Sequence, residues 1–373
     1  MPTDRGLPAP AAREHAHPAN VRAGNAAVAP TPRRAAVGPA ASMATAEPTP
    51  PPGGPTGTAD VWGWTLPLAR RCSLTMDRPL VMAILNAPPD SFSDGGRLPL
   101  LGAGRVDAGR PFGARRDEAV EPAAPAAPAA QAVPQENAAQ TLEQYIRDAI
   151  AAGADILDVG GESTRPGHAP VPAHEELRRV LPVIAAIRRV DPAIPVSIDT
   201  RKAQVAAAAI AAGADFVNDV SGLGDPAMAG VVREAGCAVV LMRNQPLARD
   251  AIAPSCAAEL DALVGKARSA GLDLNQLILD PGVGFGDPPG GDVAANMALL
   301  TAGARHHSGR PVLVGASRKR FLGTMTGEPD ASRRVGASVA AAILAVQSGA
   351  AIVRVHDVAA TVQALKVLQH APG

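Results

Sequence analysis

The hydrophobic pattern of the chain alternates between short runs rich in β-branched residues and longer Ala-rich stretches typical of helices. Eight of the short runs are expected to be strands, at residues 80–86, 154–161, 195–200, 215–220, 238–243, 277–282, 311–317 and 351–357. Helices are expected between them, among others at residues 138–152, 174–190, 202–212, 257–270 and 332–349. Strands that alternate with helices of this length predict βαβ units and a parallel sheet. Eight repeats at this spacing predict an α/β fold of the (β/α)8 TIM-barrel type.

An internal repeat supports this prediction. The segment AGADILDV at residues 152–159 resembles AGADFVNDV at residues 212–220. Both look like the end of a helix followed directly by a strand. The glycine of each copy, Gly153 or Gly213, stands where the end of a helix commonly requires a positive φ.

Two segments lie outside the pattern. Residues 1–60 are dominated by Ala and Pro, and residues 97–137 contain EPAAPAAPAAQAVPQEN. Such segments bury too little apolar surface to offset the entropy lost on ordering, so we expect a disordered tail and a flexible insertion. The barrel is then expected at residues 62–373, interrupted by that insertion. The tail could be a tether, a degenerate targeting peptide or the product of an over-extended start site, and an inert tail or such a start site is favoured.

Composition narrows the classes of function. Hydrophobic residues make up 47% of the chain but aromatic residues only 2%, so the core must consist mainly of Ala, Val, Leu and Ile. Lys and Arg number 35, as do Asp and Glu, which gives no basic surface for nucleic acid. Three cysteines are too few for a disulfide framework or a zinc site. Neither an 18-residue apolar run nor a secretory signal is present, so we expect no membrane span and a cytoplasmic location.

Each expected strand gives way to polar residues near its carboxyl end. These residues are Asn86, Asp158, Glu162, Asp199, Asn218, Arg243, Asp280, Ser317, Lys319, Arg354 and His356. A single one could cap a helix or decorate a loop, but eight consecutive strands ending in this way are poorly explained by capping. A parallel barrel gathers all of its strand ends at one rim, which is where barrel active sites lie.

The residue types at this rim suggest a substrate class. Asp and Asn side chains suit a heterocycle with adjacent N–H donors, such as an aminopyrimidinone. Ser317, Lys319, Arg354 and His356 follow the seventh and eighth strands, the usual place of a phosphate site in barrels. The polar loops 86–96 and 160–167 could cover a phosphorylated substrate. The sequence therefore predicts a pocket with acceptors inside and anion-binding groups at its rim.

Seven strings in this order carry a resemblance to a known family. They are MAILNAPPDSFSDGG, DILDVGGESTRPG, VSIDT, VNDVSG, LILDPGVGFG, VGASRKRF and RVHDV. Together they resemble the dihydropteroate synthases, barrel enzymes of folate biosynthesis, over about residues 62–370. The strings GGESTRPG and PDSFSDGG are long enough to make the resemblance specific.

The resemblance implies a transferase reaction. Enzymes of this family join 6-hydroxymethyl-7,8-dihydropterin diphosphate to 4-aminobenzoate, forming 7,8-dihydropteroate and pyrophosphate, with Mg²⁺ on the diphosphate. Pyrophosphate leaves first, and the arylamine captures a pterin-methyl cation. Such a cation needs neighbouring anions and exclusion of water more than it needs a nucleophile.

Site residues follow from the matching positions. The pterin ring is expected at Asp199, Asn218, Met242, Asp280 and Lys319. The diphosphate is expected at Thr164, Arg165, Arg354 and His356, and the 4-aminobenzoate at Pro166, Phe285 and Ser317. Asn86 is expected to help bind Mg²⁺, and catalysis is expected to depend on Asp199, Lys319 and Arg354.

Several positions depart from the family pattern. Ala87 and Pro88 replace Val and Thr in the first loop, and Arg243 stands where a His is usual. Asp287 replaces a Lys, while Arg201 and Arg320 replace small residues. None of these changes removes an expected pterin ligand, so pterin binding is better supported than turnover. The alternative to an active enzyme is a degenerate paralogue that binds pterin without catalysis.

The Ala-rich helix expected at residues 332–349 is apolar around much of its circumference. It could pack entirely against the barrel or form a close contact with a second copy. The habit of the family favours a homodimer, with small-molecule substrates as the remaining partners.

Overall fold

The computed structural model describes residues 63–70, 73–87, 135–162, 170–245, 247–248, 250–286, 292–303 and 309–370. All of these residues belong to one compact unit. The expected tail and most of the expected insertion, apart from its last residues, lie outside the described part.

Within the described residues, eight parallel strands form one sheet in the order β8-β7-β6-β5-β4-β3-β10-β9. They are β3 (Leu80–Asn86), β4 (Ile156–Gly160), β5 (Val196–Asp199), β6 (Phe216–Asp219), β7 (Val239–Met242), β8 (Leu277–Asp280), β9 (Leu313–Val314) and β10 (Ile352–Val355). A parallel bridge between Leu279 and Val312 joins the two ends of this order. The expected (β/α)8 barrel is thereby confirmed.

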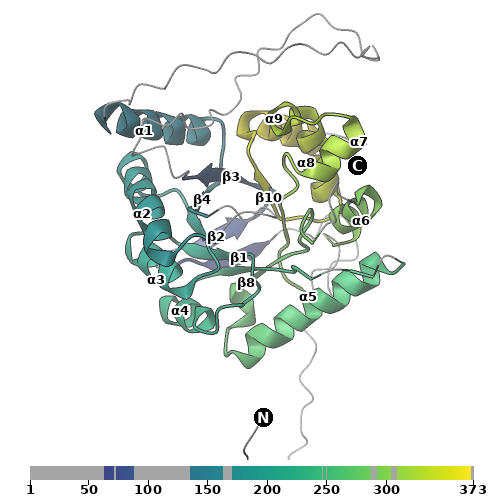
Figure 1. Ribbon diagram of the computed structural model, residues 1–373, viewed down its shortest axis with the longest axis horizontal. Coiled ribbons are helices and arrows are strands. Elements are labelled where there is room, and N and C mark those ends of the chain that lie inside the picture. The colour runs from purple at the N-terminus through teal and green to yellow at the C-terminus, as the bar shows by residue number, and fades with distance from the viewer. Residues whose placement is uncertain are drawn as a thin grey trace, which may run out of the picture. The chain divides into compact units, whose positions relative to one another are not determined.

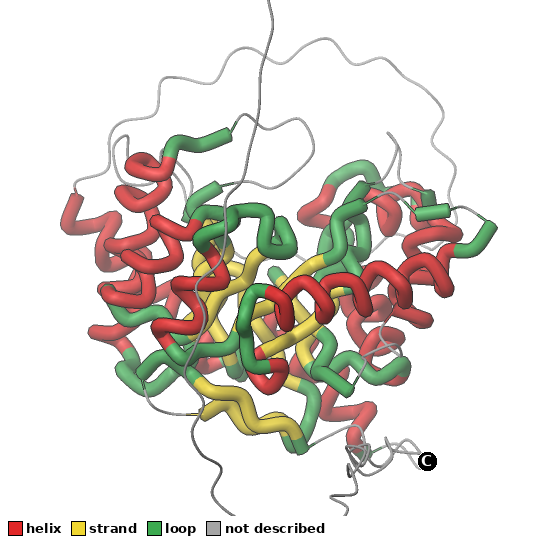
Figure 2. Tube along the Cα trace, turned by 90° about the horizontal axis from the view of Figure 1, so that it is seen from below, coloured by secondary structure: helices red, strands yellow, loops and turns green. Residues whose placement is uncertain are grey.

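Helices surround the strands (Figures 1 and 2). They are α1 (Gln135–Ala151), α2 (Ala173–Val190), α3 (Ala203–Ala211), α4 (Met228–Ala235), α5 (Ile252–Ser269), α6 (Val293–Ala298), α7 (Arg320–Thr326), α8 (Val335–Gln347) and α9 (Val358–Gln369). Short 3₁₀ turns occupy Leu274–Gln276 and Ala331–Arg333, and a π-turn occupies Leu299–Gly303. No helix in this part of the chain is both long and apolar enough to cross a membrane.

Some expected boundaries are wrong. Helix α1 begins at Gln135, so the last residues of the expected insertion 97–137 are helical. Helix α5 begins at Ile252, five residues before the expected start at 257. Pro254 does not prevent this, because it lies in the first turn of the helix, where proline needs no hydrogen-bond donor. The expected helix 332–349 is divided into a 3₁₀ turn and α8.

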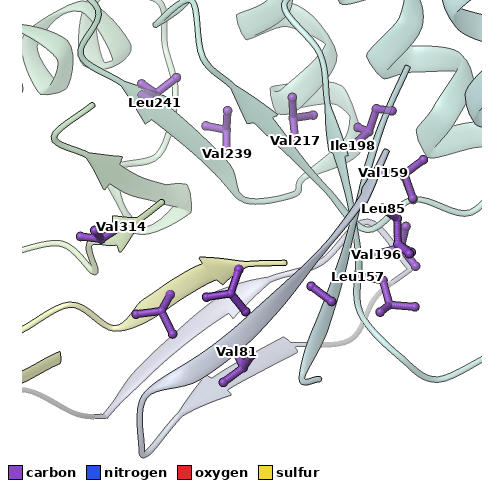
Figure 3. Packing of buried hydrophobic residues seen from close by; sticks show 14 of the residues in the cluster. Val81, Leu85, Leu157, Val159, Val196, Ile198, Val217, Val239, Leu241 and Val314 are labelled. Atoms are coloured by element: carbon purple, nitrogen blue, oxygen red, sulfur yellow. The ribbon is translucent and has the colours of Figure 1, made fainter. Parts of the chain in front are cut away.

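The core has two layers, because successive side chains of a strand point to opposite faces. One set of strand residues packs outward against the helices. Figure 3 shows ten labelled members of this set, including Leu85, Val159, Ile198, Val217 and Leu241. The alternate set fills the barrel interior, and its largest member is Phe216.

An antiparallel hairpin that the sequence did not suggest closes the amino end of the barrel. It consists of β1 (Trp64–Pro67) and β2 (Ser73–Met76). Leu66 and Met76 of the hairpin belong to the same apolar cluster as Phe216 of the interior. The carbonyl of Pro67 accepts a 2.8 Å hydrogen bond from the amide of Ala238, just before β7. The barrel interior is therefore sealed at this end, and only the carboxyl end of the strands remains for a site.

Both copies of the internal repeat play the same structural role. Gly153 and Gly213 end helices with φ of 95° and 114°, as predicted. The next acidic residue of each copy accepts a hydrogen bond from the amide of the preceding strand: Asp155 from Val81 at 2.9 Å, and Asp215 from Val196 at 2.8 Å. Each copy thus ties the amino end of one strand to its neighbour.

Candidate active site

The polar residues near the strand ends share the inward side of the barrel. Residues earlier in six of these strands, such as Phe216 and Ile278, belong to the interior apolar cluster. Positions an even number of residues further along face the same way. The inward set comprises Asn86, Asp158, Asp199, Asn218, Met242, Asp280 and Arg354. Period-two alternation therefore brings four of the five sequence-predicted pterin residues, Asp199, Asn218, Met242 and Asp280, to one wall inside the barrel.

Arg354 lies at the centre of this set. Its Nε donates to Asp158 Oδ2 at 2.6 Å, and its Nη2 donates to Asp199 Oδ2 at 2.7 Å. Burial by itself would lower the pKa of the guanidinium, but the two carboxylates outweigh that effect and hold its pKa above the usual range. Arg354 is thus a permanent cation between two buried carboxylates, with its side chain 20% exposed.

Asp158 is the functional residue that sequence reasoning left without a role. Its side chain is fully buried, and its Oδ2 also accepts from Asn218 Nδ2 at 3.4 Å. It links Arg354 of β10 to Asn218 of β6. A signal for it existed in the sequence, because an acidic residue stands at an inward position of the otherwise apolar run ILDVG.

Asp199 has a shifted titration. Burial raises its pKa to about 7, assisted by the nearby charge of Asp158 and opposed by Arg354. Near neutral pH this carboxyl group can therefore carry a proton or lack one. Within the described residues, the buried atoms Asp158 Oδ1 and Asp199 Oδ1 have no hydrogen-bond partner. Two buried acceptors without donors are costly, so this wall is suited to a ligand that presents N–H groups.

Asp280 lies on the same inward wall, at the end of β8. Its side chain is buried, and its Oδ1 accepts from the amide of Gly282 at 2.7 Å. Burial raises its pKa, while the charge of Lys319 and the bond from Gly282 act in the opposite direction. Met242, opposite Asp280 in the register of β7 and β8, is 1% exposed and supplies an apolar surface beside these groups.

Lys319, which follows β9, contacts Phe285 in the loop after β8. The Lys319 ammonium lies 4.0 Å from the centre of the Phe285 ring, within the range of a cation–π contact, and donates to the carbonyl of Val283. A Cβ at Gly284, whose φ is 77°, would collide with the Lys319 side chain. The glycine therefore leaves room for the lysine side chain to cross the loop.

Ser317 and His356 meet at the ends of β9 and β10. The Ser317 hydroxyl accepts from the backbone amide of His356 at 3.2 Å and lies 3.1 Å from its Nδ1. Thr164, Arg165, Pro166, Pro88 and Asp287 lie outside the described residues.

Asn86 is exposed at the end of β3, and its setting fits an Mg²⁺ ion. A Cβ built on Gly160 would lie 3.7 Å from both Asn86 Oδ1 and Asp199 Oδ2, so these oxygens flank the same glycine. Mg²⁺ prefers such oxygens and usually takes one or two protein ligands with phosphate and water. No cage of three or more His, Cys, Asp or Glu side chains occurs in the described residues. An ion at Asn86 would therefore draw most of its ligands from a diphosphate and water.

Arg201, one of the departures from the family pattern, fixes the start of the second long loop. Its Nη2 lies 2.5 Å from Glu162 Oε1, and Lys202 binds the other oxygen of Glu162. Lys202 also lies 2.5 Å from the fully buried Glu176. Arg320, another departure, is exposed at the first residue of α7.

Comparisons with known proteins agree with this geometry. A sequence model of the family described as "Pterin binding enzyme" matches residues 132–356. The dihydropteroate synthase of Neisseria meningitidis serogroup B is 37% identical over 317 residues, covering 80% of this chain and 95% of that protein. A probable bifunctional folylpolyglutamate synthase/dihydropteroate synthase of Haloferax volcanii is 39% identical over 78% of this chain, which spans only 30% of that longer protein.

Solved structures show the same relationship. Dihydropteroate synthase from Xanthomonas albilineans with 4-aminobenzoic acid superimposes with a TM-score of 0.65 at 38% identity, covering 83% of this chain and 100% of that one. The same enzyme in complex with 7,8-dihydropteroate gives a TM-score of 0.62, covering 80% of this chain and 97% of that one. The barrel, the inward acidic residues and these matches together show that the chain belongs to the dihydropteroate synthase family of pterin-binding enzymes.

Proposed function

We propose that this chain joins 6-hydroxymethyl-7,8-dihydropterin diphosphate to 4-aminobenzoate, releasing pyrophosphate and forming 7,8-dihydropteroate. The observation that carries this proposal is the wall formed by Asp158, Asp199, Asn218 and Asp280 inside the barrel. Its unpartnered buried acceptors match the N–H groups of a pterin ring. The Xanthomonas albilineans relative with 7,8-dihydropteroate bound supports this choice of ligand.

The same wall suits the chemistry. When the pyrophosphate leaves, positive charge develops on the pterin methylene, and buried carboxylates fixed beforehand stabilise it without reorganising. The two cysteines that the structure describes, Cys237 and Cys256, are buried, and burial raises the pKa of each thiol to about 11. Neither is a thiolate nucleophile at neutral pH. This supports direct capture of the cation by the arylamine.

Diphosphate would bind toward the outer part of the mouth. Lys319 and His356 supply positive charge or N–H donors there, and Arg354 contributes its field from below. Asn86 would hold Mg²⁺, which neutralises the charge of the leaving pyrophosphate when bound. Arg354 itself is engaged by Asp158 and Asp199, so its part in this proposal is to keep both carboxylates in place.

The 4-aminobenzoate would bind between Phe285 and Ser317. The half-buried Phe285 ring offers an apolar face, and the Lys319 ammonium beside it attracts the carboxylate of this substrate. Ser317 adds a hydroxyl at the end of β9. The relative with 4-aminobenzoic acid bound supports this substrate.

The proposal extends to a homodimer in the cytoplasm. The outward face of α8 carries Gly336, Ala340 and Leu344, of which Leu344 is 38% exposed. Small and apolar residues at this spacing form one stripe along a helix and allow a close approach of a second helix. The cysteine usage, with Cys237 and Cys256 free and buried, suits a reducing compartment.

The experiment that tests the reaction measures pyrophosphate release by the full chain from the pterin diphosphate, with and without 4-aminobenzoate and with and without a chelator. Release that requires Mg²⁺, together with formation of 7,8-dihydropteroate when 4-aminobenzoate is present, is expected. Complementation of a bacterium that lacks its own dihydropteroate synthase provides the test in cells. Pterin binding without any release would reject the proposal and identify a binding protein instead.

A further inference from the structure

Arg243 is a buried cation to which the proposed chemistry gives no part. It follows β7 directly, at a position where the family pattern has a His, and it is 2% exposed. Burying a guanidinium costs several kcal/mol unless its surroundings compensate. Its placement therefore calls for a physical explanation.

Both the backbone and the side chain of Arg243 hold the segment that follows β8. Its amide donates to the carbonyl of Asp280 at 3.0 Å, and its Nε donates to the carbonyl of Pro281 at 2.9 Å. Its Nη1 donates to the carbonyl of Gln245, which ties the loop after β7 to the same guanidinium. Two neighbouring loops are thereby joined through one side chain.

The next residue of the held segment, Gly282, touches the backbone of Arg243. Its φ is 70°, in the left-handed region, and a Cβ built there would collide with the Arg243 carbonyl. From this position its amide donates to Asp280 Oδ1 at 2.7 Å. A continuous set of contacts therefore runs from the Arg243 guanidinium, through Pro281 and Gly282, to the carboxylate of Asp280.

We infer that Arg243 is a positioning residue for pterin binding: it holds the turn 280–282 so that the Gly282 amide orients the Asp280 carboxylate toward the ring. The inference rests on the proposed function in taking Asp280 as a pterin ligand. It gives Arg243 a role that is performed through two backbone groups, the Pro281 carbonyl and the Gly282 amide, rather than by contact with a substrate. A buried carboxylate oriented by one fixed amide gains directional specificity from that bond.

The charged groups around Asp280 allow a positioning role of Arg243 to be distinguished from an effect of its charge. The charged and titratable groups that face it are Lys319 after β9, Arg354 of β10, Arg243 after β7 and Cys256 of α5. Lys319 and the Gly282 bond act on the Asp280 pKa more strongly than the Arg243 charge does. Loss of Arg243 should therefore act mainly by loosening Gly282, and a lysine at the same position should not restore the turn.

The experiment uses Arg243→Met, which keeps the side-chain length without a donor, and Arg243→Lys, which keeps only the charge. Arg188→Met is the matched control, because Arg188 also donates to backbone carbonyls, those of Gly213 and Ile194, but at the amino end of the barrel beside Asp215. Three quantities are measured: hydrogen exchange of the Gly282 amide, the pH at which the Asp280 carboxyl titrates by ¹³C NMR, and the affinity for a pterin without diphosphate. The first two require no substrate.

We expect Arg243→Met and Arg243→Lys to speed Gly282 exchange and to move the Asp280 titration to higher pH. Pterin affinity should fall about tenfold, the typical result of losing one buried hydrogen bond. Arg188→Met should lower the Tm and change none of the three. If Arg243→Lys shows wild-type values of all three quantities, Arg243 acts through its charge and the positioning role is rejected. Unchanged Gly282 exchange and Asp280 titration in Arg243→Met would also reject the inference.

If Arg243→Met does not fold, Arg243→Gln, which retains one amide donor, is measured in the same way and decides by the same criteria. Product formation by the unmodified chain tests the proposed reaction separately. If the wild type forms no product but the variants show the expected changes at Gly282 and Asp280, the proposed reaction is rejected and the positioning role of Arg243 is retained.

Discussion

The titration of Asp199 makes a quantitative prediction for Asp199→Asn, which resembles the protonated aspartate in shape. In the folded protein, burial raises the pKa of this carboxyl group to about 7, from 3.8 for an unperturbed aspartate. Folding therefore binds a proton at pH values between these two. A group whose folded pKa is raised stabilises the fold at low pH and loses that contribution as pH rises through the folded pKa.

The magnitude follows from this linkage. Where the folded state holds one proton more than the unfolded state, the free energy of unfolding falls by about 1.4 kcal/mol per pH unit. For Asp199 this slope applies between about pH 4 and pH 7 and vanishes above pH 7. Asparagine cannot titrate, so the variant lacks this contribution. The free energy of unfolding of Asp199→Asn should therefore rise relative to wild type as pH increases through this window.

The assay is urea unfolding of both ligand-free proteins at pH 5, 6, 7 and 8. All other titrating groups are present in both proteins, so the pH dependence of the difference reports the titration of Asp199 together with the charged groups that it contacts. The bond from Arg354 favours the ionised form of Asp199, so its effect is already contained in the folded pKa and adds no separate constant shift. A difference that stays constant from pH 5 to pH 7 would refute the assigned titration. Pterin affinity should fall in the same variant most clearly above pH 7, where wild-type Asp199 is ionised and the variant lacks that carboxylate.

Four further predictions address the site and the flanking segments. Asp280→Asn should weaken pterin binding at least tens-fold, since removing a buried charged partner costs roughly 2–5 kcal/mol, and an unchanged affinity in the folded variant would contradict the assignment. Arg354→Met should lower the free energy of unfolding by about 3–5 kcal/mol at pH 8, because Asp158 and Asp199 lose their counter-charge, and by less at pH 6, where Asp199 can take up a proton. Deleting residues 1–60 should leave the Tm and the turnover unchanged, and aggregation or loss of activity would show that the tail packs on the barrel. Shortening 97–137 ahead of α1 should cost little stability, about 0.6 kcal/mol per twofold change in loop length, as measured by thermal unfolding.

Local pattern determined much of this protein. The sequence shows the eight strand runs and their order along the chain, because strand–helix spacing is a property of neighbouring residues. Period-two alternation also places Asp199, Asn218 and Asp280 at positions that face the inside of the barrel. The repeat at Gly153 and Gly213 was equally visible, since a positive φ at a helix end is a local requirement. The prediction of a barrel, and of a site at the carboxyl ends of its strands, followed from these features alone.

Only the tertiary structure decided which of these side chains pair. Arg354 binds Asp158 and Asp199, which lie 196 and 155 residues away in the chain, so no local pattern could reveal that this cation is buried among the carboxylates. The hairpin that seals the barrel was missed because two four-residue strands show too little periodicity to stand out. The hold of Arg243 on the turn before Gly282 depends on the adjacency of β7 and β8, a contact that exists only once the barrel has formed.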